Sequence, residues 1–254
     1  MMPLASADMF GSEGSGNQKK FWTKDNKLVK LNSKYREADK EVSAYELGTM
    51  FGLDMVRYEK KEYMFRSQKC IGCECENYLQ PFEFSIPFSE LFSGSEAVIN
   101  FNTRASEFFD ITVRLICDLT HFPADSVRRY IMQILVFDYI ICNEDRHLSN
   151  FEIIKNEKTG AYRFAPIYDN GLSFLKSNAV LTQAELQKRL KKYKSMPFSR
   201  NPKTNLIDLK EAKQIALEYK ANADLNGGIL NNFNITEFHR RLANQRLNEL
   251  LSLK

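Results

Sequence analysis

Hydrophobic and polar residues alternate differently in the two parts of the chain. Residues 21–31 carry apolar side chains on both sides of a polar turn, which predicts a β-hairpin. Between residues 36 and 51 the apolar side chains recur at helical spacing, which predicts a helix. Short strands are predicted at residues 55–58 and 63–66. The first 70 or so residues are therefore expected to run strand, strand, helix, strand, strand.

The remainder of the chain has a mostly helical pattern. Residues 70–92, which include two prolines, are expected to form an irregular connection or an inserted loop. Helices are predicted at residues 108–119, 123–141, 181–193, 207–222 and 236–251, and strands at residues 151–154 and 162–164. The helix that ends at Ile141 is apolar on most faces from Tyr130 onward, so we expect it in the core.

This order of elements predicts an α+β protein with two lobes. We expect a small antiparallel β lobe with one helix over residues 1–70, and a larger helical lobe over residues 71–254. The longest apolar stretch, residues 134–142, is interrupted by Asp138 and is far shorter than the ~20 residues that a membrane-spanning helix needs. A membrane is therefore not an expected partner.

Composition restricts the partners further. With 254 residues, 43% of them hydrophobic and 27% charged, the chain can bury a sizeable core. Its net charge of +4, from 36 basic and 32 acidic residues, is too small to make a nucleic acid the expected partner. Five cysteines and a start without the basic residues of a secretion signal favour reduced thiols and a cytoplasmic location.

Three polar residues in the second half carry the chemistry that we expect. Asp145 is followed by Asn150 five residues later, and Asp169 follows beyond a segment of hairpin length. Phosphoryl transfer requires such a set, because one carboxylate orients the acceptor hydroxyl and receives its proton while an amide and a second carboxylate hold magnesium. Either half alone is equally compatible with solvated turn residues. Both halves in this order favour a site.

The same residues carry a family resemblance. The pattern Asn143-x-Asp145-x-His147-x-x-Asn150, followed by Ala165-Pro166-x-Tyr168-Asp169, resembles the HipA-like serine/threonine kinases. That family includes small CtkA-type members and is distantly related to phosphoinositide lipid kinases. The resemblance implies a two-lobed, protein-kinase-like fold that places ATP between the lobes.

The resemblance also implies a role for each matching residue. Asp145 would be the catalytic base, and Asn150 and Asp169 would be the metal ligands. Lys30 would contact the α and β phosphates of ATP and would be held by Glu41. His147 belongs to the catalytic set as a structural support or a phosphate contact, although a hydrogen-bonded core histidine is an equally good interpretation.

A glycine-bearing stretch near the start resembles the phosphate-covering loop of the family. Its expected nucleotide-binding residues are Gly14, Ser15, Gly16, Asn17 and Gln18. The alternative is a frayed terminus, because glycine loops are common. Members of the family autophosphorylate this loop, which makes Ser15, with Ser12 as second choice, a candidate modification site. A phosphate on Ser15 is predicted to lower ATP affinity by like-charge repulsion.

Two departures limit what the resemblance carries over. The sequence is shorter than typical HipA proteins, which have an additional N-terminal subdomain, so target choice and partner contacts do not transfer. Glu144, rather than an arginine, precedes Asp145. Activation through an arginine that binds a phosphorylated loop is therefore not expected.

The expected function is an ATP- and Mg²⁺-dependent serine/threonine protein kinase capable of autophosphorylation. By resemblance, its protein substrate would be a translation component and its partner an antitoxin, as for a toxin of a toxin–antitoxin pair, or the protein would be an effector. One alternative is a pseudokinase that acts as a nucleotide-binding scaffold. Another is an enzyme of the same fold that phosphorylates a small molecule, a lipid or RNA, because acceptor choice resides in the loops.

Two weaker patterns remain. Cys70, Cys73 and Cys75 could supply three thiolates to Zn²⁺, but reduced loop thiols are the preferred interpretation because a closed zinc site needs four ligands. The basic run of residues 188–194 is usually a solvated helix face. As a functional element it would attract an acidic protein or RNA, and the loop of residues 195–203 would border the substrate groove.

Overall fold

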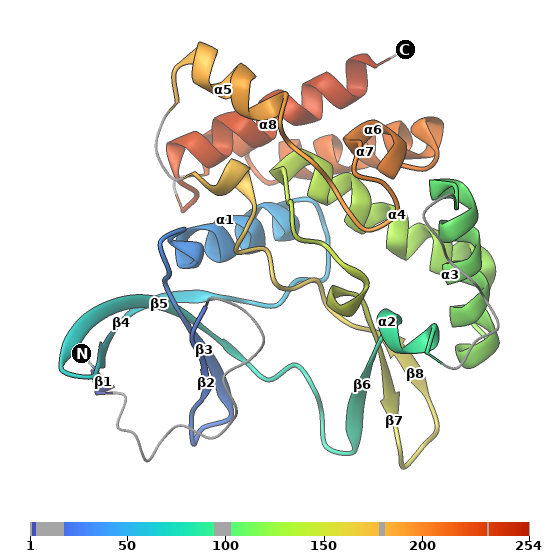
Figure 1. The fold of residues 1–254 in the computed structure, drawn as a ribbon, viewed down its shortest axis with the longest axis horizontal. Helices are drawn as coiled ribbons and strands as arrows, with labels where there is room; N and C mark the ends of the chain where they lie inside the picture. Colours follow the sequence, from blue (N-terminus) through green and yellow to red (C-terminus); the bar gives the residue numbers. More distant parts are fainter. Residues whose placement is uncertain (1, 4–17, 94–102, 178–180, 233, 254) are drawn as a thin grey trace.

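The predicted hairpin forms at one edge of a five-stranded sheet (Figure 1). The computed structural model describes residues 2–3, 18–93, 103–177, 181–232 and 234–253. The sheet has the strand order β1-β4-β5-β3-β2 and is antiparallel except for the β1–β4 pair. Its strands are β1 (Met2–Pro3), β2 (Lys20–Trp22), β3 (Lys27–Leu31), β4 (Glu59–Phe65) and β5 (Gln68–Glu76).

Helix α1 (Glu37–Met50) packs against one face of this sheet. Side chains alternate between the two faces of a strand, so Val29 and Leu31 are buried on the face away from α1, together with Tyr63. Lys30 lies between them in sequence and therefore points to the α1 face, where it is only 2% exposed. The sheet thus delivers a buried lysine to the helix that carries Glu41.

The larger part of the chain combines a three-stranded antiparallel sheet with helices (Figure 1). The sheet has the order β6-β7-β8, formed by β6 (Glu83–Pro87), β7 (Glu152–Asn156) and β8 (Tyr162–Phe164). The helices are α2 (Phe88–Leu91), α3 (Ala105–Thr120), α4 (Ala124–Ile141), α5 (Gln183–Leu190), α6 (Pro202–Asn205), α7 (Leu209–Leu225) and α8 (Glu237–Ser252), with short 3₁₀ turns at Leu148–Asn150, Phe174–Lys176 and Ile229–Asn231.

Helix α4 is the centre of the main core, because α3, α7 and α8 all pack against it. Its apolar side chains from Ile131 to Ile141 are buried, as its sequence predicts. Asp138 is buried among them at 1% exposure. A buried carboxylate among so many apolar side chains needs a specific partner.

Within the described part of the chain, no helix has both the length and the apolar character that crossing a bilayer requires.

The structure confirms the α+β class, with a small sheet lobe and a larger helical part. The predicted hairpin and the predicted helices form within a few residues of their expected bounds. The strand predicted at residues 55–58 is wrong. Only Met55 forms a bridge there, to Ile167, because Val56 and Tyr58 are buried as core contacts rather than paired in a sheet.

The irregular connection predicted for residues 70–92 is also wrong. β5 runs across residue 70, so the small sheet continues to Glu76, and β6 follows. Gly72 permits close strand pairing, since a Cβ there would lie 2.6 Å from the carbonyl oxygen of Lys30. Pro87 ends β6, and β6 is an edge strand, which tolerates proline.

Candidate active site

The loop after α4 is fixed by the side chain of Asn143. Its Nδ2 donates to Oδ1 of Asp138 at 2.9 Å, and its Oδ1 accepts from the backbone N–H of Asp145 at 3.1 Å. Cys142 makes the turn out of the helix with a left-handed φ of 50°. The helix end therefore presents Asp145 from a loop whose backbone is anchored to buried groups.

Arg146 joins this loop to the segment that carries Asp169. Its guanidinium is 0% exposed and forms a two-contact pair with Asp138, at 2.9 and 3.1 Å. The same group donates to the carbonyl oxygen of Tyr168 at 2.7 Å and to Oδ1 of Asn170 at 2.6 Å. Arg146 therefore holds the two residues on either side of Asp169 while it sits next to Asp145.

Asn150 lies at the end of a short 3₁₀ turn and is 6% exposed. Its Nδ2 donates to the backbone oxygen of Asp145 at 3.1 Å. With the amide in this orientation, its Oδ1 accepts no hydrogen bond from the residues that the structure describes. That oxygen is therefore available to a ligand.

Lys30 connects the small sheet, α1 and the Asp169 segment. Its ammonium lies 2.7 Å from Oε1 of Glu41 and 2.7 Å from Oδ1 of Asp169. The second oxygen of Glu41 accepts from the backbone N–H of Asn170 at 2.9 Å. Glu41 is 0% exposed, whereas the side chain of Asp169 keeps 25% of its surface exposed. Asp169 is thus the member of this cluster that can face a ligand.

The charges in this cluster stabilise one another. Burial disfavours the charged form of Lys30, but Asp169 and Glu41 raise its pKa well above the usual value. Burial likewise opposes ionisation of Asp169, but Lys30 and Lys20 hold the pKa of that carboxyl well below its usual range. Lys30 is therefore a cation and Asp169 an anion at neutral pH.

Asp145 has the opposite electrostatic character. Burial raises the pKa of its carboxyl above the ordinary value, the charge of His147 opposes that shift, and the charge of Asp169 adds to it. A carboxylate with a raised pKa is a better proton acceptor than an ordinary exposed one.

His147 is partly buried, and its backbone oxygen accepts from Asn150 N–H at 2.9 Å.

Lys20, the last residue of the 14–20 stretch that resembles the phosphate-covering loop, belongs to the cluster, although the sequence assigned it no individual role. It pairs directly with Lys30 across the β2–β3 hairpin, and its ammonium lies 3.6 Å from Oδ2 of Asp169. Two lysines side by side on one face repel each other, so the pair favours an anion between or beneath them. The signal was present in the sequence, because a hairpin centred on its turn places Lys20 opposite Lys30.

The glycine-bearing stretch falls mostly outside the described residues. Ser12, Gly14, Ser15, Gly16 and Asn17 all lie there, so their predicted roles stay predictions. Gln18 is described, and its side-chain Nε2 is buried without a hydrogen-bond partner among the described residues. It is a free donor two residues from Lys20.

The three cysteines of β5 do not converge. Cys73 and Cys75 are buried on the α1 face with Val56 and Tyr58, whereas Cys70 packs on the opposite face. The spacing Cys70-x-x-Cys73 puts an odd number of steps between them, which reverses the face of a strand. No cluster of three or more His, Cys, Asp or Glu side chains suited to a metal occurs in the part of the chain that the structure describes. The zinc interpretation is therefore wrong.

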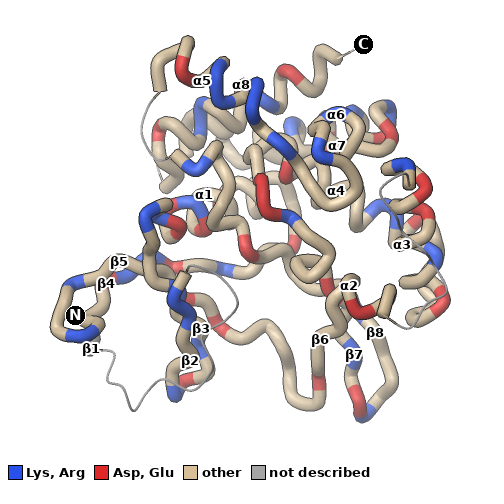
Figure 2. The backbone as a smooth tube through the Cα atoms, in the orientation of Figure 1, with Lys and Arg blue, Asp and Glu red and all other residues tan. Residues whose placement is uncertain are grey.

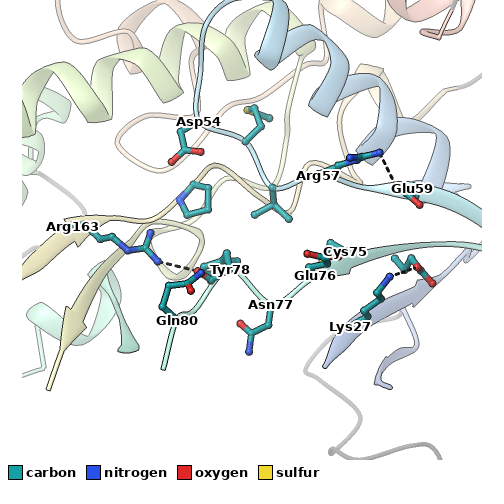
Figure 3. A pocket seen from close by; sticks show the side chains of 14 residues that line it. Lys27, Asp54, Arg57, Glu59, Cys75, Glu76, Asn77, Tyr78, Gln80 and Arg163 are labelled. Carbon is teal, nitrogen blue, oxygen red and sulfur yellow. Dashed lines mark hydrogen bonds and ion pairs between the residues drawn. The ribbon is translucent and has the colours of Figure 1, made fainter. Parts of the chain in front are cut away.

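A cavity of about 560 Å³ opens beside the connection between the two sheets (Figure 3). Its lining includes Asp54, Asn77, Tyr78 and Arg163, and the ion pair of Arg57 with Glu59 at 2.9 Å lies at its edge. None of Lys30, Glu41, Asp145, Asn150 and Asp169 lines it. The candidate site is therefore the charged cluster and not this cavity.

Comparison with solved structures identifies the fold. The chain is similar to a Helicobacter pylori proinflammatory kinase, CtkA, with a TM-score of 0.65 and 16% sequence identity over 93% of this chain and 90% of that one. It is also similar to a chain of the Shewanella oneidensis MR-1 toxin–antitoxin complex of HipA, HipB and operator DNA, with a TM-score of 0.53 and 11% identity over 98% of this chain and 68% of that one.

These similarities confirm the expected resemblance at the level of the fold. The chain has the kinase-like fold of the HipA and CtkA structures. No protein-family model matches the sequence, and no curated protein matches it significantly.

Proposed function

We propose that this chain is an ATP- and Mg²⁺-dependent phosphotransferase that acts on serine or threonine hydroxyls of a protein. One observation carries the proposal: the buried ammonium of Lys30 joins Glu41 and Asp169 through two 2.7 Å contacts. Lysine held by a helix glutamate, next to an aspartate at the metal position, is the arrangement that kinases use to bind nucleotide phosphates. A scaffold protein would not need all of these groups.

The donor set fits magnesium. Mg²⁺ prefers oxygen ligands, and the partly exposed carboxylate of Asp169 and the unoccupied Oδ1 of Asn150 supply two of them. Asp145 and Asp169 lie close enough for the charge of one to raise the pKa of the other, which is consistent with one shared site. Bound Mg²⁺ would neutralise charge on the phosphates of ATP.

The side chains of the chain itself would position the reactants. Lys30 and Lys20 would bind phosphate oxygens, and Gln18 would donate from its unpartnered Nε2. Asp145 would accept the hydrogen bond of the acceptor hydroxyl and take its proton during transfer. Arg146 would not touch the substrate but would hold both loops in register. His147 would support the loop, since its backbone oxygen accepts from the N–H of Asn150.

Incubation with γ-labelled ATP and Mg²⁺, alone and with a cell lysate, tests this proposal. We expect label on serine or threonine of the protein itself, including Ser15 or Ser12, and on lysate proteins identified by mass spectrometry. Asp145→Asn keeps the size of the side chain and removes the proton acceptor, so transfer should fall by on the order of 10²-fold or more.

The matched control is nucleotide binding by the same variant. Asp145→Asn should bind ATP with Mg²⁺ nearly as well as the parent, because its side chain makes no contact with Lys30 or Glu41 among those described. If the label appeared on lipid or RNA in the lysate and not on protein, the acceptor would be that lipid or RNA and not a protein hydroxyl. Binding of ATP without any transfer would favour the scaffold function instead.

The partner proposals follow from resemblance alone. The Shewanella structure contains HipB and operator DNA, and an antitoxin-like protein partner is therefore proposed here by analogy. Co-purification of this chain with products of neighbouring genes tests it. A toxin or effector role, and a translation component as substrate, are proposals of the same kind.

A further inference from the structure

The segment from residue 181 to residue 203 holds an unusual share of the positive charge. It contains seven Lys and Arg residues and one acidic residue, a formal charge of +6, whereas the whole chain carries +4. The rest of the molecule is therefore slightly acidic. Figure 2 shows the basic residues following one another along α5 and the chain after it. The field of this segment is local and not a property of the whole surface.

Most of these charges have no counter-charge. Six side chains are exposed and form no ion pair with any residue that the structure describes: Lys188, Lys191, Lys192, Lys194, Arg200 and Lys203. Elsewhere the chain pairs many of its surface cations, such as Arg128 with Asp110 and Arg241 with Glu237. Four of the six line an open hollow of about 720 Å³: Lys191, Lys192, Lys194 and Arg200.

Two hydrogen-bonding side chains, the buried Tyr193 and the exposed Arg189, attach this basic surface to the candidate active site. The hydroxyl of Tyr193 lies 3.2 Å from the carbonyl oxygen of Asp138 and 3.4 Å from that of Asn143, which is two residues before Asp145. The guanidinium of Arg189 donates to the carbonyl oxygen of Leu175 at 3.0 Å, in the segment after Asp169. The lysines on either side of Tyr193 are thus held at a fixed place beside the catalytic loop.

We propose that this basic surface docks an acidic segment of the phosphoacceptor protein, a few residues from the hydroxyl that is phosphorylated. The proposal rests on the proposed kinase function and specifies its substrate class. Unpaired cations around a hollow complement a run of Asp and Glu, and such complementarity raises the rate of encounter and sets the register of a partner. Because the basic surface is anchored beside Asn143, an acidic segment docked on it would place the acceptor hydroxyl at a fixed position relative to Asp145.

An acidic peptide fits the surface better than single-stranded RNA. RNA of this kind needs exposed aromatic side chains on which its bases stack. Tyr193 is only 5% exposed, and Phe198 only 7%. The exposed large aromatics of the described residues are Phe82 and Phe84, on or next to β6, not in this segment. The surface offers charge without a stacking platform, which suits carboxylates.

The test measures binding without ATP, so it does not depend on catalysis. A fluorescent serine-containing peptide with six Glu residues is compared with the same peptide carrying six Gln residues, by anisotropy at low salt. We expect the Glu peptide to bind at least roughly tenfold more tightly, the sum of several exposed charge contacts. The triple variant Lys191→Glu, Lys192→Glu, Lys194→Glu should abolish the difference.

A matched variant separates local docking from net charge. Lys210→Glu, Lys213→Glu, Lys220→Glu makes the same charge change on α7, away from the hollow, and should keep the preference for the Glu peptide. In transfer assays the first triple variant should raise KM for the Glu peptide by roughly tenfold and leave kcat unchanged.

Three outcomes overturn the docking proposal. Equal binding of the two peptides, or equal loss in both triple variants, shows that the segment is a solvated face. Tighter binding of a 20-nucleotide single-stranded RNA, lost only in the first variant, would show that the partner is a nucleic acid and not an acidic protein.

A different outcome would refute the kinase function alone. Selective binding of the Glu peptide by a protein that transfers no phosphate supports docking and contradicts phosphoryl transfer, so the two failures are distinguishable.

Discussion

Two buried cations organise the candidate site, and they differ in what surrounds them. Lys30 is bound by two carboxylates, and one of these, Asp169, keeps a quarter of its side chain exposed. Arg146 is bound by the buried Asp138 and by carbonyl and amide oxygens of the two loops. In the proposed function, Lys30 would therefore exchange a contact with Asp169 for one with a phosphate. Arg146 has no contact that a ligand could replace.

We therefore expect Lys30 to act in nucleotide binding and Arg146 to act in folding of the site. Loss of Lys30 should damage nucleotide binding more than folding, because Asp169 retains Lys20 and solvent. Loss of Arg146 should damage folding first, because Asp138 would remain buried without a counter-charge. The predictions that follow test this division, beginning with the largest expected effect on stability.

Arg146→Met should lower the free energy of unfolding by about 3–5 kcal/mol, the usual cost of removing one partner of a buried ion pair. Urea denaturation measures it. Arg163→Met is the matched control, because Arg163 pairs with Glu83 at 2.7 Å but keeps 38% of its side chain exposed. Its cost should be about 1 kcal/mol or less. Similar losses in the two variants would contradict the assembly role of Arg146.

The double variant Arg146→Met with Asp138→Leu sharpens the same point. Replacing both charges by apolar groups should recover much of the stability, since the unpaired carboxylate is gone. Phosphoryl transfer should stay low, because the carbonyl oxygen of Tyr168 and Oδ1 of Asn170 have then lost their guanidinium donor. Recovery of transfer together with stability would show that the loops do not need Arg146.

His239 extends the comparison to a buried group that is neutral. It is 0% exposed, and its ring nitrogens lie 2.7 Å from Oγ of Ser43 in α1 and 3.0 Å from the carbonyl oxygen of Ser177. Burial lowers its pKa to about 4, although the Ser177 carbonyl opposes the shift. The unfolded chain, with a histidine pKa near ~6.5, binds the proton more readily.

Protonation of His239 therefore favours unfolding. Its stabilising effect is complete above about pH 6.5 and is lost as the pH falls toward about 4. Between about pH 7 and pH 4.5 the loss should be about 2 kcal/mol, measured by urea denaturation. His239→Phe should have a correspondingly smaller pH dependence over this range. An unchanged pH dependence would place the acid sensitivity in other groups.

Lys30→Met should lower the free energy of unfolding by about 3 kcal/mol, because Glu41 is left buried without its counter-charge. The loss should be smaller than for Arg146→Met, because Arg146 also donates to the oxygens of Tyr168 and Asn170. Transfer should nevertheless fall by on the order of 10²-fold, the usual cost of one preorganised group that stabilises charge. Denaturation and γ-label assays on the same preparation measure both effects. A larger stability loss than for Arg146→Met would reverse the division of roles.

Lys20→Ala should have the smallest effect. Its ammonium is 3.6 Å from Asp169 and its side chain is 30% exposed, so stability should change by about 1 kcal/mol or less. ATP affinity should fall by a few-fold, because Lys30 would still be in place to bind the phosphates. Unchanged ATP affinity, measured by calorimetry, would remove Lys20 from the phosphate-binding set.

Local patterns predicted most of the helices, because several of them carry their own start signals. Thr182, Asp208 and Thr236 each cap a helix with the side chain, as their positions before periodic segments suggest. β5 was not predicted because Ile71 is its only β-branched residue, it has no aromatic residue, and Cys, Gly, Glu, Gln and Lys make up the rest of the strand.

The site was predictable in its members but not in its assembly. Family resemblance selected Lys30, Glu41 and Asp169, which the structure brings together. The role of Arg146 could not be predicted, because its four partner residues come from α4, from its own loop and from the segment around Asp169, which only the tertiary fold joins. Asp138, alone in an apolar helix, was the available signal that a buried cation must lie nearby.

Calorimetric titration of ATP with and without Mg²⁺, for the parent protein and for Asp169→Asn, tests the central claim most directly. If Asp169, Asn150 and Lys30 form one nucleotide–metal site, Mg²⁺ should tighten ATP binding to the parent by roughly tenfold or more and should have little effect on the variant. An equal response to Mg²⁺ in both proteins, or no ATP binding by the parent, would contradict the account.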